Sequence, residues 1–486
     1  MLLILFAAMA YSSQEQTISD LKKYMYGIAS DATEGRFTGS AGYKKAADFV
    51  VSQLKADGLK PLYQPVPFFR DNYNGSSITF VNHTGSRIFR HSAANFVIVR
   101  PGLPQKTSLQ APVFIGYGIE DTAWNDYAGV QVTGKWVVML NGLPSALQTR
   151  YSDPDSIKYQ ALLHHHVAGV ILLPDSNVTR DWETTVIRQY RFGYMHYAGA
   201  GAEPEKPAIP SILIHPRLAR ELFKSERYDP LGGTGTYHAF VLTTKLAVCL
   251  NKKREHINSC NIMALAPGTD PHFKNETIIA GAHLDHIGRI GKHIYNGAND
   301  DASGCVALLG AARAIAAKRC KRPVLFVFYT GEELNLLGSR YFMEHPPIPV
   351  QHMLMNINLE QVGSQHRSFH GIWALGSPEF RNAFFQSGVI FPEQDLNYSS
   401  ADSVLDILSN TDSYSFMKKD VPSLLLGSGG FPEHHSILDK IDLIDFEHLN
   451  KARLLLTTLI YDLGNGLPGS KFELISNDFP LSLPKF

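Results

Sequence analysis

The sequence predicts an α/β fold: a mixed, mostly parallel central sheet flanked by helices, with an inserted smaller α/β domain. Short apolar runs bounded by turn residues, at 277–282, 324–328 and 353–359, are typical of buried strands. The Ala-rich run 305–317 lies between the first two and predicts a helix. Strands that alternate with helices pair in parallel. Polar residues that follow them therefore meet at one edge of the sheet, where open α/β sheets bind ligands.

Imidazole and carboxylate side chains gather directly after these elements. The helix at 305–317 is preceded by Asp300, Asp301 and Ser303, which are residue types favoured at the start of a helix. Histidine and carboxylate ligands together suit a divalent metal, zinc above all, and no cysteine is placed to compete with them. The other clusters are His283, Asp285 and His286 after the first strand, Glu332 and Glu333 after the second, Glu360 after the third, and His434, His435 and Asp439 after a fourth strand at 422–426.

Taken in this order, the motifs resemble those of the secreted two-zinc exopeptidases of metallopeptidase family twenty-eight, of the leucyl-aminopeptidase type. The resemblance covers most of residues 18–465. It implies the zinc exopeptidase fold, which is phosphorylase/hydrolase-like, and a secreted zinc aminopeptidase that acts on peptides with a free N-terminus. The matching motifs are His283-x-Asp285, Asn299-Asp300-x-x-Ser-Gly, Gly-Glu332-Glu333-x-x-x-x-Gly-Ser and His435-Ser-x-x-Asp439.

The resemblance implies a metal centre that holds two Zn²⁺ ions. Asp300 would bridge the two ions. His283 and Glu360 would complete one site, and Glu333 and His435 would complete the other. One shared carboxylate plus terminal ligands of both kinds is the set that a two-zinc site requires. Relatives usually have Asp at the position of Glu360, and the extra methylene of Glu leaves the strength of that site open.

The resemblance also implies roles for side chains that do not bind metal. Glu332 would be the general base that moves protons during peptide hydrolysis. Asp285 would accept the second ring N–H of the first histidine ligand and fix its tautomer. His286, His434 and Asp412 would line the cleft. Asp412 stands in Thr-Asp-Ser, where many relatives have Ser-Asp-His, so we expect an altered substrate pocket.

Other functions remain open on the same scaffold. A carboxypeptidase or dipeptidase would need an arginine cluster to hold a terminal carboxylate, and the sequence alone places none beside the ligands. A one-zinc glutaminyl cyclase would follow if Glu360 left the second site weak. A receptor-like homologue that has lost its metals is disfavoured, because the whole ligand set is retained.

The chain divides into a catalytic domain, an insert and two terminal segments. The region from about 105 to 235 has the order strand, Gly-Lys strand, helix, Gly-Val strand, which resembles a protease-associated domain. Such an insert would act as a lid over the site or as a spacer, and the sequence favours neither. The predicted parts are a signal peptide at 1–13, the N-terminal part of the catalytic domain at 14–100, the protease-associated insert at 101–238, the catalytic zinc-peptidase domain at 239–465 and a tail at 466–486.

Composition and charge narrow the choice of partners and compartment. Lys+Arg and Asp+Glu are equal at 45 each, without a basic run, which gives no support for nucleic-acid binding. The apolar N-terminus resembles the core of a secretory signal and is too short to span a bilayer. We therefore expect a secreted or periplasmic protein with no integral membrane segment. A disulfide between Cys249 and Cys260 and the oligomeric state both remain open.

A run of three histidines, His164, His165 and His166, suggests a metal site at first sight. Successive residues of a helix point about 100° apart. Three such side chains cannot converge on one ion. We therefore predict that this run is an exposed stretch of helix that binds no metal.

Overall fold

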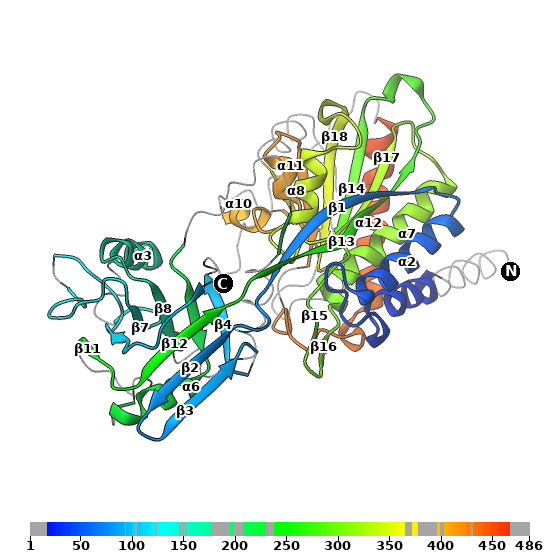
Figure 1. Ribbon diagram of the computed structural model, residues 1–486. Coiled ribbons are helices and arrows are strands. Elements are labelled where there is room, and N and C mark those ends of the chain that lie inside the picture. The colour runs from blue at the N-terminus through cyan, green and yellow to red at the C-terminus, as the bar shows by residue number, and fades with distance from the viewer. Residues whose placement is uncertain are drawn as a thin grey trace. The chain divides into compact units, whose positions relative to one another are not determined.

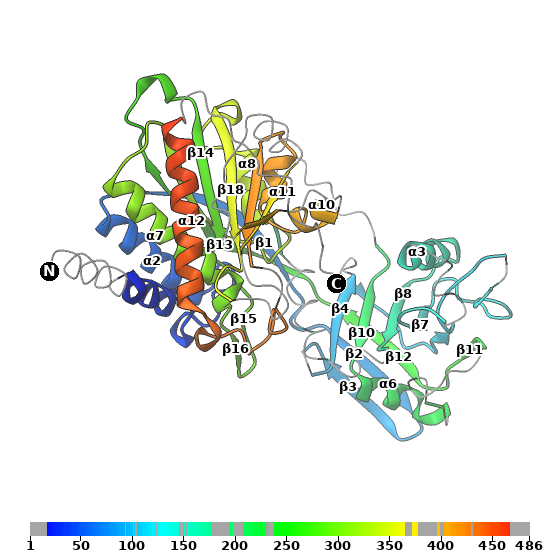
Figure 2. The same ribbon diagram turned by 180° about the vertical axis from the view of Figure 1, so that it is seen from behind.

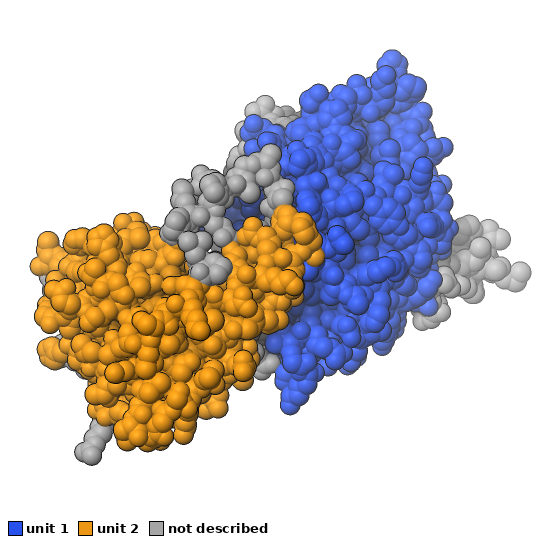
Figure 3. All heavy atoms as spheres, in the orientation of Figure 1, with its two compact units in different colours: residues 1–68, 257–486 blue, residues 69–256 orange. Residues whose placement is uncertain are grey.

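The computed structural model describes residues 17–466 of the 486 in the chain, apart from several gaps. Contacts divide the chain into unit 1, which comprises Met1–Phe68 and Ile257–Phe486, and unit 2, which comprises Phe69–His256 (Figure 3). The predicted signal segment at 1–13 and all but the first residue of the predicted tail lie outside the described residues. The gaps are 93, 101, 103–104, 123, 145–146, 148–149, 151–152, 176–181, 183–185, 187–194, 198–207, 227, 230, 232–237, 365–371, 378–395, 399–402 and 429–430.

The main sheet of unit 1 is mixed. In spatial order its strands are β20 (Leu396–Tyr398), β19 (Ile372–Gly376), β21 (Ser423–Gly427), β18 (Met353–Glu360), β14 (Thr277–His283), β17 (Val324–Tyr329), β13 (Lys253–Ala266) and β1 (Pro61–Asn72). β14 pairs in parallel with β17 and β18, and β18 pairs in parallel with β21. β13 and β19 run antiparallel to their neighbours β17 and β21. The predicted mixed α/β fold is confirmed.

Alternation along the buried strands sorts their side chains between the two faces of this sheet. Ala280 and Ala282 of β14 belong to the larger core of unit 1, whereas Ile279 belongs to a separate core on the other face. His283 has the parity of Ile279 and therefore falls on that second face. The same alternation in β18 turns Glu360 to this face, because Met355, Ile357 and Leu359 before it belong to the larger core.

Helices cover both faces of the sheet (Figures 1 and 2). The first face carries the helix at 17–29, α2 (Ala41–Ala56), α7 (Gly304–Ala317) and α12 (Phe446–Asn465), and the second carries α8 (Leu337–Glu344) and α11 (Ser413–Met417), with α10 (Ser403–Leu408) beside β19. α7 is apolar on nearly all sides because it lies between the sheet and α12. Side-chain caps fix the helix starts: Ser40 accepts the N–H of Tyr43 in α2, and Asp445 accepts two N–H groups in α12.

Short elements complete unit 1. They are the two-stranded ribbon of β15 (Gly288–Ile290) and β16 (His293–Tyr295), the single π turn η5 (Ala298–Ser303), and the 3-10 turns η1 (Asp31–Thr33), η4 (Pro271–Phe273), η6 (Val350–His352) and η8 (Ile441–Leu443). η5 leads directly into α7. It contains Asp300, so the backbone at this candidate ligand is irregular rather than helical.

Unit 2 is built from two smaller sheets. The six-stranded sheet has the order β11 (Phe240–Val241), β6 (Val113–Phe114), β7 (Trp136–Leu140), β8 (Gly169–Leu173), β10 (Ser211–Ile214) and β4 (Phe96–Arg100). The four-stranded sheet has the order β3 (Gly85–Arg90), β2 (Ser77–Asn82), β12 (Lys245–Leu250) and β5 (Gln105–Lys106). The other described elements are α3 (Pro154–His164), α6 (Pro216–Phe223), η3 (Lys224–Glu226) and β9 (Met195–Tyr197).

Unit 2 is wider at both ends than the insert that the sequence predicts at 101–238. It begins at Phe69 and ends at His256. The reason is strand pairing: β4 pairs with β10, β11 pairs with β6, and β2 pairs with β12. The segments that flank the predicted insert thus share sheets with it or with each other. The predicted order of strand, strand, helix and strand within the insert corresponds to β6, β7, α3 and β8.

Two further findings concern cysteines and membrane spans. All four cysteines are free thiols, so Cys249 and Cys260 do not form a disulfide. Within the described residues, no helix combines the length and the apolar character needed to cross a bilayer.

Candidate metal centre

Four candidate residues stand where neighbouring parallel strands end. His283 is the last residue of β14, and Glu360 is the last residue of β18. Glu332 and Glu333 follow β17, whose last residue, Tyr329, pairs with His283. Because the carboxyl ends of parallel strands share one edge of a sheet, this pairing joins residues that are far apart in the sequence. His283 and Glu360, 77 positions apart, come within hydrogen-bonding distance.

Asp300 lies in η5, and its backbone is held by another carboxylate. Oδ1 of Asp439 accepts the N–H of Asn299 at 2.8 Å, and Oδ2 accepts the N–H of Asp300 at 3.1 Å. Asp439 is fully buried. The sequence-based prediction gave Asp439 no role, although the motif that begins at His435 contains it. Because it holds the backbone N–H groups of Asn299 and Asp300 directly, Asp439 is a positioning residue.

The five predicted metal ligands come together around Asp300. Oδ1 of Asp300 lies 3.2 Å from Nε2 of His283, and Oδ2 lies 3.1 Å from Nε2 of His435. Oε1 of Glu360 is 3.2 Å from the same nitrogen of His283. Oε2 of Glu333 is 3.0 Å from the same nitrogen of His435. Each oxygen of Asp300 therefore faces a different imidazole–carboxylate pair.

His434 and His286 also reach this centre. Nε2 of His434 lies 3.0 Å from Oδ2 of Asp300, and Nδ1 of His286 lies 2.6 Å from Oε1 of Glu333. The sequence predicts that both rings line a cleft. The structure makes His286 fully buried, whereas the side chain of His434 is 42% exposed. His435 contacts two carboxylates and His434 contacts one, which favours His435 as the ligand.

The supporting role predicted for Asp285 needs correction. Nδ1 of His283 lies 3.1 Å from the backbone oxygen of Asp285, whereas the Asp285 carboxylate is 3.9 Å away. That carboxylate is turned elsewhere: Oδ2 accepts the hydroxyl of Thr38 at 2.8 Å, and Oδ1 accepts the N–H of Glu332 at 3.1 Å. Asp285 therefore fixes the ring of His283 through its carbonyl and fixes the backbone of Glu332 through its carboxylate.

A buried arginine connects the loops around the centre. Arg36 is fully buried and donates to the backbone oxygens of Leu284, Asn296 and Gly297. Leu284 follows the ligand at the end of β14, and Gly297 precedes η5. An arginine in a glycine-rich loop is usually exposed, so the sequence offered no signal for this role.

Burial and neighbouring charges shift the acidities of the centre. Burial alone would raise the pKa of Asp300, but hydrogen bonds from His283, His434 and His435 hold this pKa well below its usual range. Burial raises the pKa of Glu332 well above its usual value, and His283 offsets only part of the rise. Protonation is therefore disfavoured at Asp300 and favoured at Glu332.

Asp412 is also fully buried, at the start of α11. Burial raises the pKa of Asp412 to about 7, and the charge of His283 opposes this rise. The carboxylate of Asp412 therefore interacts electrostatically with His283 of the centre. The prediction that Asp412 shapes a substrate pocket stays a prediction.

The donor set fits zinc. Ligand atoms around a tetrahedral zinc lie about 3.3 Å apart, given Zn–N and Zn–O bonds of about 2.0–2.2 Å. The measured separations around Asp300 are 3.0–3.2 Å. The buried Oε2 of Glu360 has no hydrogen-bond donor among the described residues. Buried acceptors in that state are costly unless a cation satisfies them.

The fold and the site define a class: an α/β protein with an imidazole–carboxylate metal centre at the ends of parallel strands. Residues 261–460 match the model of peptidase family M28. This matched segment spans less than half of the chain. Asp300 and all its partners in the centre lie within it.

Similar proteins extend this result. Over 96 residues the chain is 34% identical to a probable leucine aminopeptidase 2 from Aspergillus oryzae, a match that covers 20% of this chain and only 18% of that protein. An aminopeptidase from Aneurinibacillus sp. strain AM-1 shares the fold with a TM-score of 0.60 at 17% identity, over 95% of this chain and 96% of that one. A zinc aminopeptidase from Bacillus subtilis gives a TM-score of 0.59 at 17% identity, over 93% and 97%.

Proposed function

We propose that the chain is a two-zinc aminopeptidase that removes residues from the N-terminus of peptides. The position of Asp300 carries this proposal, because its two oxygens face separate pairs, His283 with Glu360 and His435 with Glu333. A carboxylate that bridges two cations presents its oxygens in this way. The match of residues 261–460 to family M28 and the aminopeptidase names of similar proteins support the reaction class.

The five ligand side chains would hold the two zinc ions. Bound zinc lowers the pKa of a coordinated water towards about 7 and polarises the carbonyl of the scissile bond. Glu360 supports rather than weakens the second site: despite its extra methylene, its Oε1 lies 3.2 Å from Nε2 of His283, the same distance as Oδ1 of Asp300. This geometry favours two ions over the single ion of a glutaminyl cyclase.

Glu332 would serve as the general base. Its Oε2 is 3.7 Å from Nε2 of His283, farther than the ligand oxygens of Asp300 and Glu360 at 3.2 Å, which favours a base beside the metal ligands over a further ligand. The N–H bond to Asp285 fixes its backbone. Its carboxylate would take a proton from the attacking water and pass it to the amine that leaves.

A free substrate amine is the group that this centre suits best. Glu332, a carboxylate beside the proposed metal ligands, can accept a hydrogen bond from a free α-amine, whereas an ionised terminal carboxylate has no hydrogen to donate to it. Arg36 lies near the centre, but its guanidinium donates hydrogen bonds to backbone oxygens. It does not offer the arginine clamp that a carboxypeptidase would need.

The test is the release of chromophore from aminoacyl anilides. We expect cleavage of leucyl p-nitroanilide, loss of cleavage after chelation, recovery with Zn²⁺, and no cleavage of the N-acetyl analogue. Metal content by mass spectrometry should give two zinc ions at the centre. Hydrolysis of N-blocked peptides from the C-terminus, or cyclisation of N-terminal glutamine, would instead assign a different reaction.

Two further parts of the prediction remain proposals. We propose that residues 1–13 are a secretory signal and that the core of unit 2 is a protease-associated domain. The order β6, β7, α3 and β8 supports the second proposal. N-terminal sequencing of the mature chain from culture medium would test the first, since an intact residue 1 would contradict it.

A further inference from the structure

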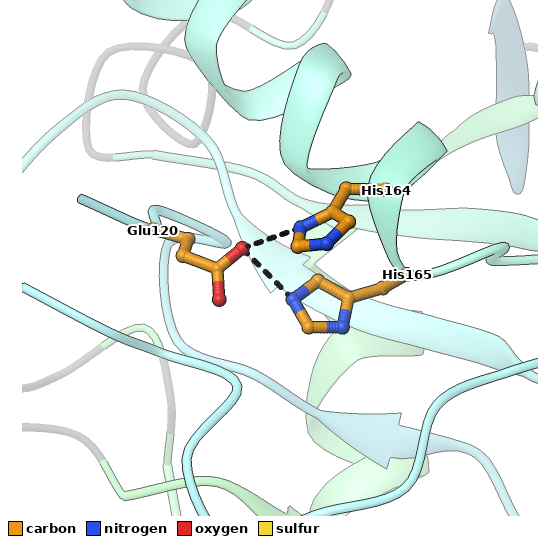
Figure 4. A group of neighbouring side chains, drawn as sticks. All are labelled: Glu120, His164 and His165. Carbon is orange, nitrogen blue, oxygen red and sulfur yellow. Dashed lines mark hydrogen bonds and ion pairs between the residues drawn. The ribbon is translucent and has the colours of Figure 1, made fainter.

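Unit 2 contains a second group of histidines and a carboxylate, formed by Glu120, His164 and His165 (Figure 4). Nδ1 of His164 lies 3.1 Å from Oε2 of Glu120, and Nε2 of His165 lies 3.0 Å from the same oxygen. We call these three residues the Glu120 cluster. The sequence predicts a histidine run that binds no metal, and the structure shows that two of its rings converge.

The convergence arises because the helix ends within the histidine run. His164 is the last residue of α3, and His165 is its C-cap, with φ −84° and ψ 3°. His166 then takes a left-handed φ of 52° and is not part of the cluster. The angle of about 100° between successive side chains holds only inside a regular helix. At the helix end the two rings can use different nitrogens to face one oxygen.

The segment that carries Glu120 is held in place by its own contacts. Oε1 of Glu120 accepts the side-chain N–H of Asn125 at 3.3 Å, which leaves Oε2 for the rings. The buried carboxylate of Asp126 accepts the N–H of Ile119 at 3.0 Å. Tyr127 stacks on His165 with ring centroids 4.0 Å apart and planes 9° apart. The carboxylate and one ring therefore keep their positions without a bound ion.

We propose that the Glu120 cluster binds a divalent transition-metal cation such as Zn²⁺, independently of the metal centre of unit 1. Two imidazoles and one carboxylate form a ligand set that zinc uses in proteins, with a further position left to water. The distances of 3.0 and 3.1 Å are close to the roughly 3.3 Å between ligand atoms of a tetrahedral zinc.

Electrostatics at the cluster also favour a cation. The C-terminus of a helix carries a partial negative charge, and both rings stand at the C-terminus of α3. Burial acts to raise the pKa of Glu120, but the hydrogen bonds from the two rings outweigh it and lower the net pKa. Glu120 is therefore ionised, as a metal ligand must be. A bound ion would join the end of α3 to the segment 119–127 and stiffen this part of unit 2.

The test counts zinc on the full-length chain after equilibrium dialysis against buffered free Zn²⁺. We compare the natural protein with Glu120→Gln, with the double variant His164→Asn and His165→Asn, and with His166→Asn. The last variant is a matched control, because His166 is exposed and adjacent but outside the cluster. We expect the natural protein and the control to retain one more zinc per chain than the other two variants. Equal zinc contents in all four proteins would overturn the proposal.

Hydrogen exchange supplies a second readout that does not depend on counting. Zn²⁺ should slow amide exchange in 119–127 and at the end of α3 in the natural protein, and not in Glu120→Gln. Peptidase activity should be the same in all variants, since none changes a residue of the unit 1 centre. If the double variant fails to fold, the single variant His164→Asn replaces it, because that side chain is 74% exposed. Zinc-dependent protection that persists in Glu120→Gln would place the ion elsewhere.

Discussion

The metal centre of unit 1 and the Glu120 cluster of unit 2 use the same kinds of ligand but surround them differently. In the centre, the side chains of His283 and Asp300 are 1% and 3% exposed. In the cluster, the side chains of His164 and Glu120 are 74% and 25% exposed. The centre gathers ligands from three strand ends, η5 and a late loop, whereas the cluster joins one helix end to one nearby segment.

The difference shows what a reactive site requires beyond ligands. Around the centre, Asp439, Asp285 and Arg36 hold the ligand-bearing backbone from distant parts of the chain. Among the described residues, the Glu120 cluster is supported chiefly by Asn125 and Tyr127. Burial strengthens electrostatic interactions and keeps bulk water away. The proposed reaction therefore belongs to the centre, and the proposal for the cluster is limited to ion binding.

The largest effect that separates the two sites is expected from Glu332→Gln. The amide cannot accept a proton, so kcat should fall by about 10³-fold while zinc content is unchanged. Steady-state kinetics and metal analysis on the same sample check this. Glu344→Gln, an exposed glutamate at the end of α8, is the control. Loss of zinc from Glu332→Gln would make that residue a ligand instead of a base.

Acid should act on unit 2 through a histidine outside both sites. Burial lowers the pKa of His91 to about 4, from an ordinary value near 6.5. Between pH 6.5 and about 4, His91 is therefore protonated in the unfolded chain and neutral in the folded chain. The contribution of His91 to the free energy of unfolding is fully present above pH 6.5, and the free energy of unfolding falls by up to about 3 kcal/mol as the pH drops to about 4.

Denaturant unfolding of unit 2 between pH 7 and 4 measures this loss. His91→Phe should remove most of the slope, whereas His83→Phe, at an exposed position, should keep it. The same pH range also bears on the unit 1 centre and the Glu120 cluster, because imidazole ligands release metal in acid. A slope that survives in His91→Phe would show that other groups cause the acid sensitivity.

A smaller effect is expected from Asp439→Asn. The new side-chain NH₂ cannot accept a hydrogen bond, so one of the two backbone N–H groups, of Asn299 or Asp300, loses its acceptor. Asp300 is then held less firmly. Supporting residues of this kind typically change metal affinity by about 10–100-fold. Competition with a chelator measures the affinity, and Asp442→Asn, three residues further on and exposed, is the control. Unchanged affinity would mean that the turn holds Asp300 without Asp439.

The smallest effect is expected at the ring that stacks on His165. Tyr127→Leu removes the aromatic face, and stacked rings contribute about 0.5–1.5 kcal/mol. Zinc affinity at the Glu120 cluster should fall several-fold, and Tyr127→Phe should restore it. Isothermal titration calorimetry of each variant with Zn²⁺, after the unit 1 centre has been filled with zinc, measures this affinity. A full effect in Tyr127→Phe would point to the hydroxyl rather than the ring.

Much of unit 1 was predictable because its signals are local. Apolar runs marked β14, β17 and β18, and the residues directly after them reached the centre as expected. The boundaries of unit 2 were less accessible, because β2 and β12 pair across more than 160 residues and nothing in either strand identifies its partner. The convergence of His164 and His165 on Glu120 was not predicted for a different reason: the prediction assumed a helix that continued through the histidine run, and α3 ends at His164.

The sequence by itself determined the residue types that hold a metal and the elements that carry them, since strand and helix patterns and ligand chemistry depend on nearby residues. Only the tertiary structure decided which partner each polar group meets. Asp285 holds Glu332 rather than the ring of His283, and Arg36 is buried among backbone oxygens. The physical reason is that such contacts join segments brought together by packing, and a polar side chain turns to whichever donor or acceptor the folded chain places within about 3 Å.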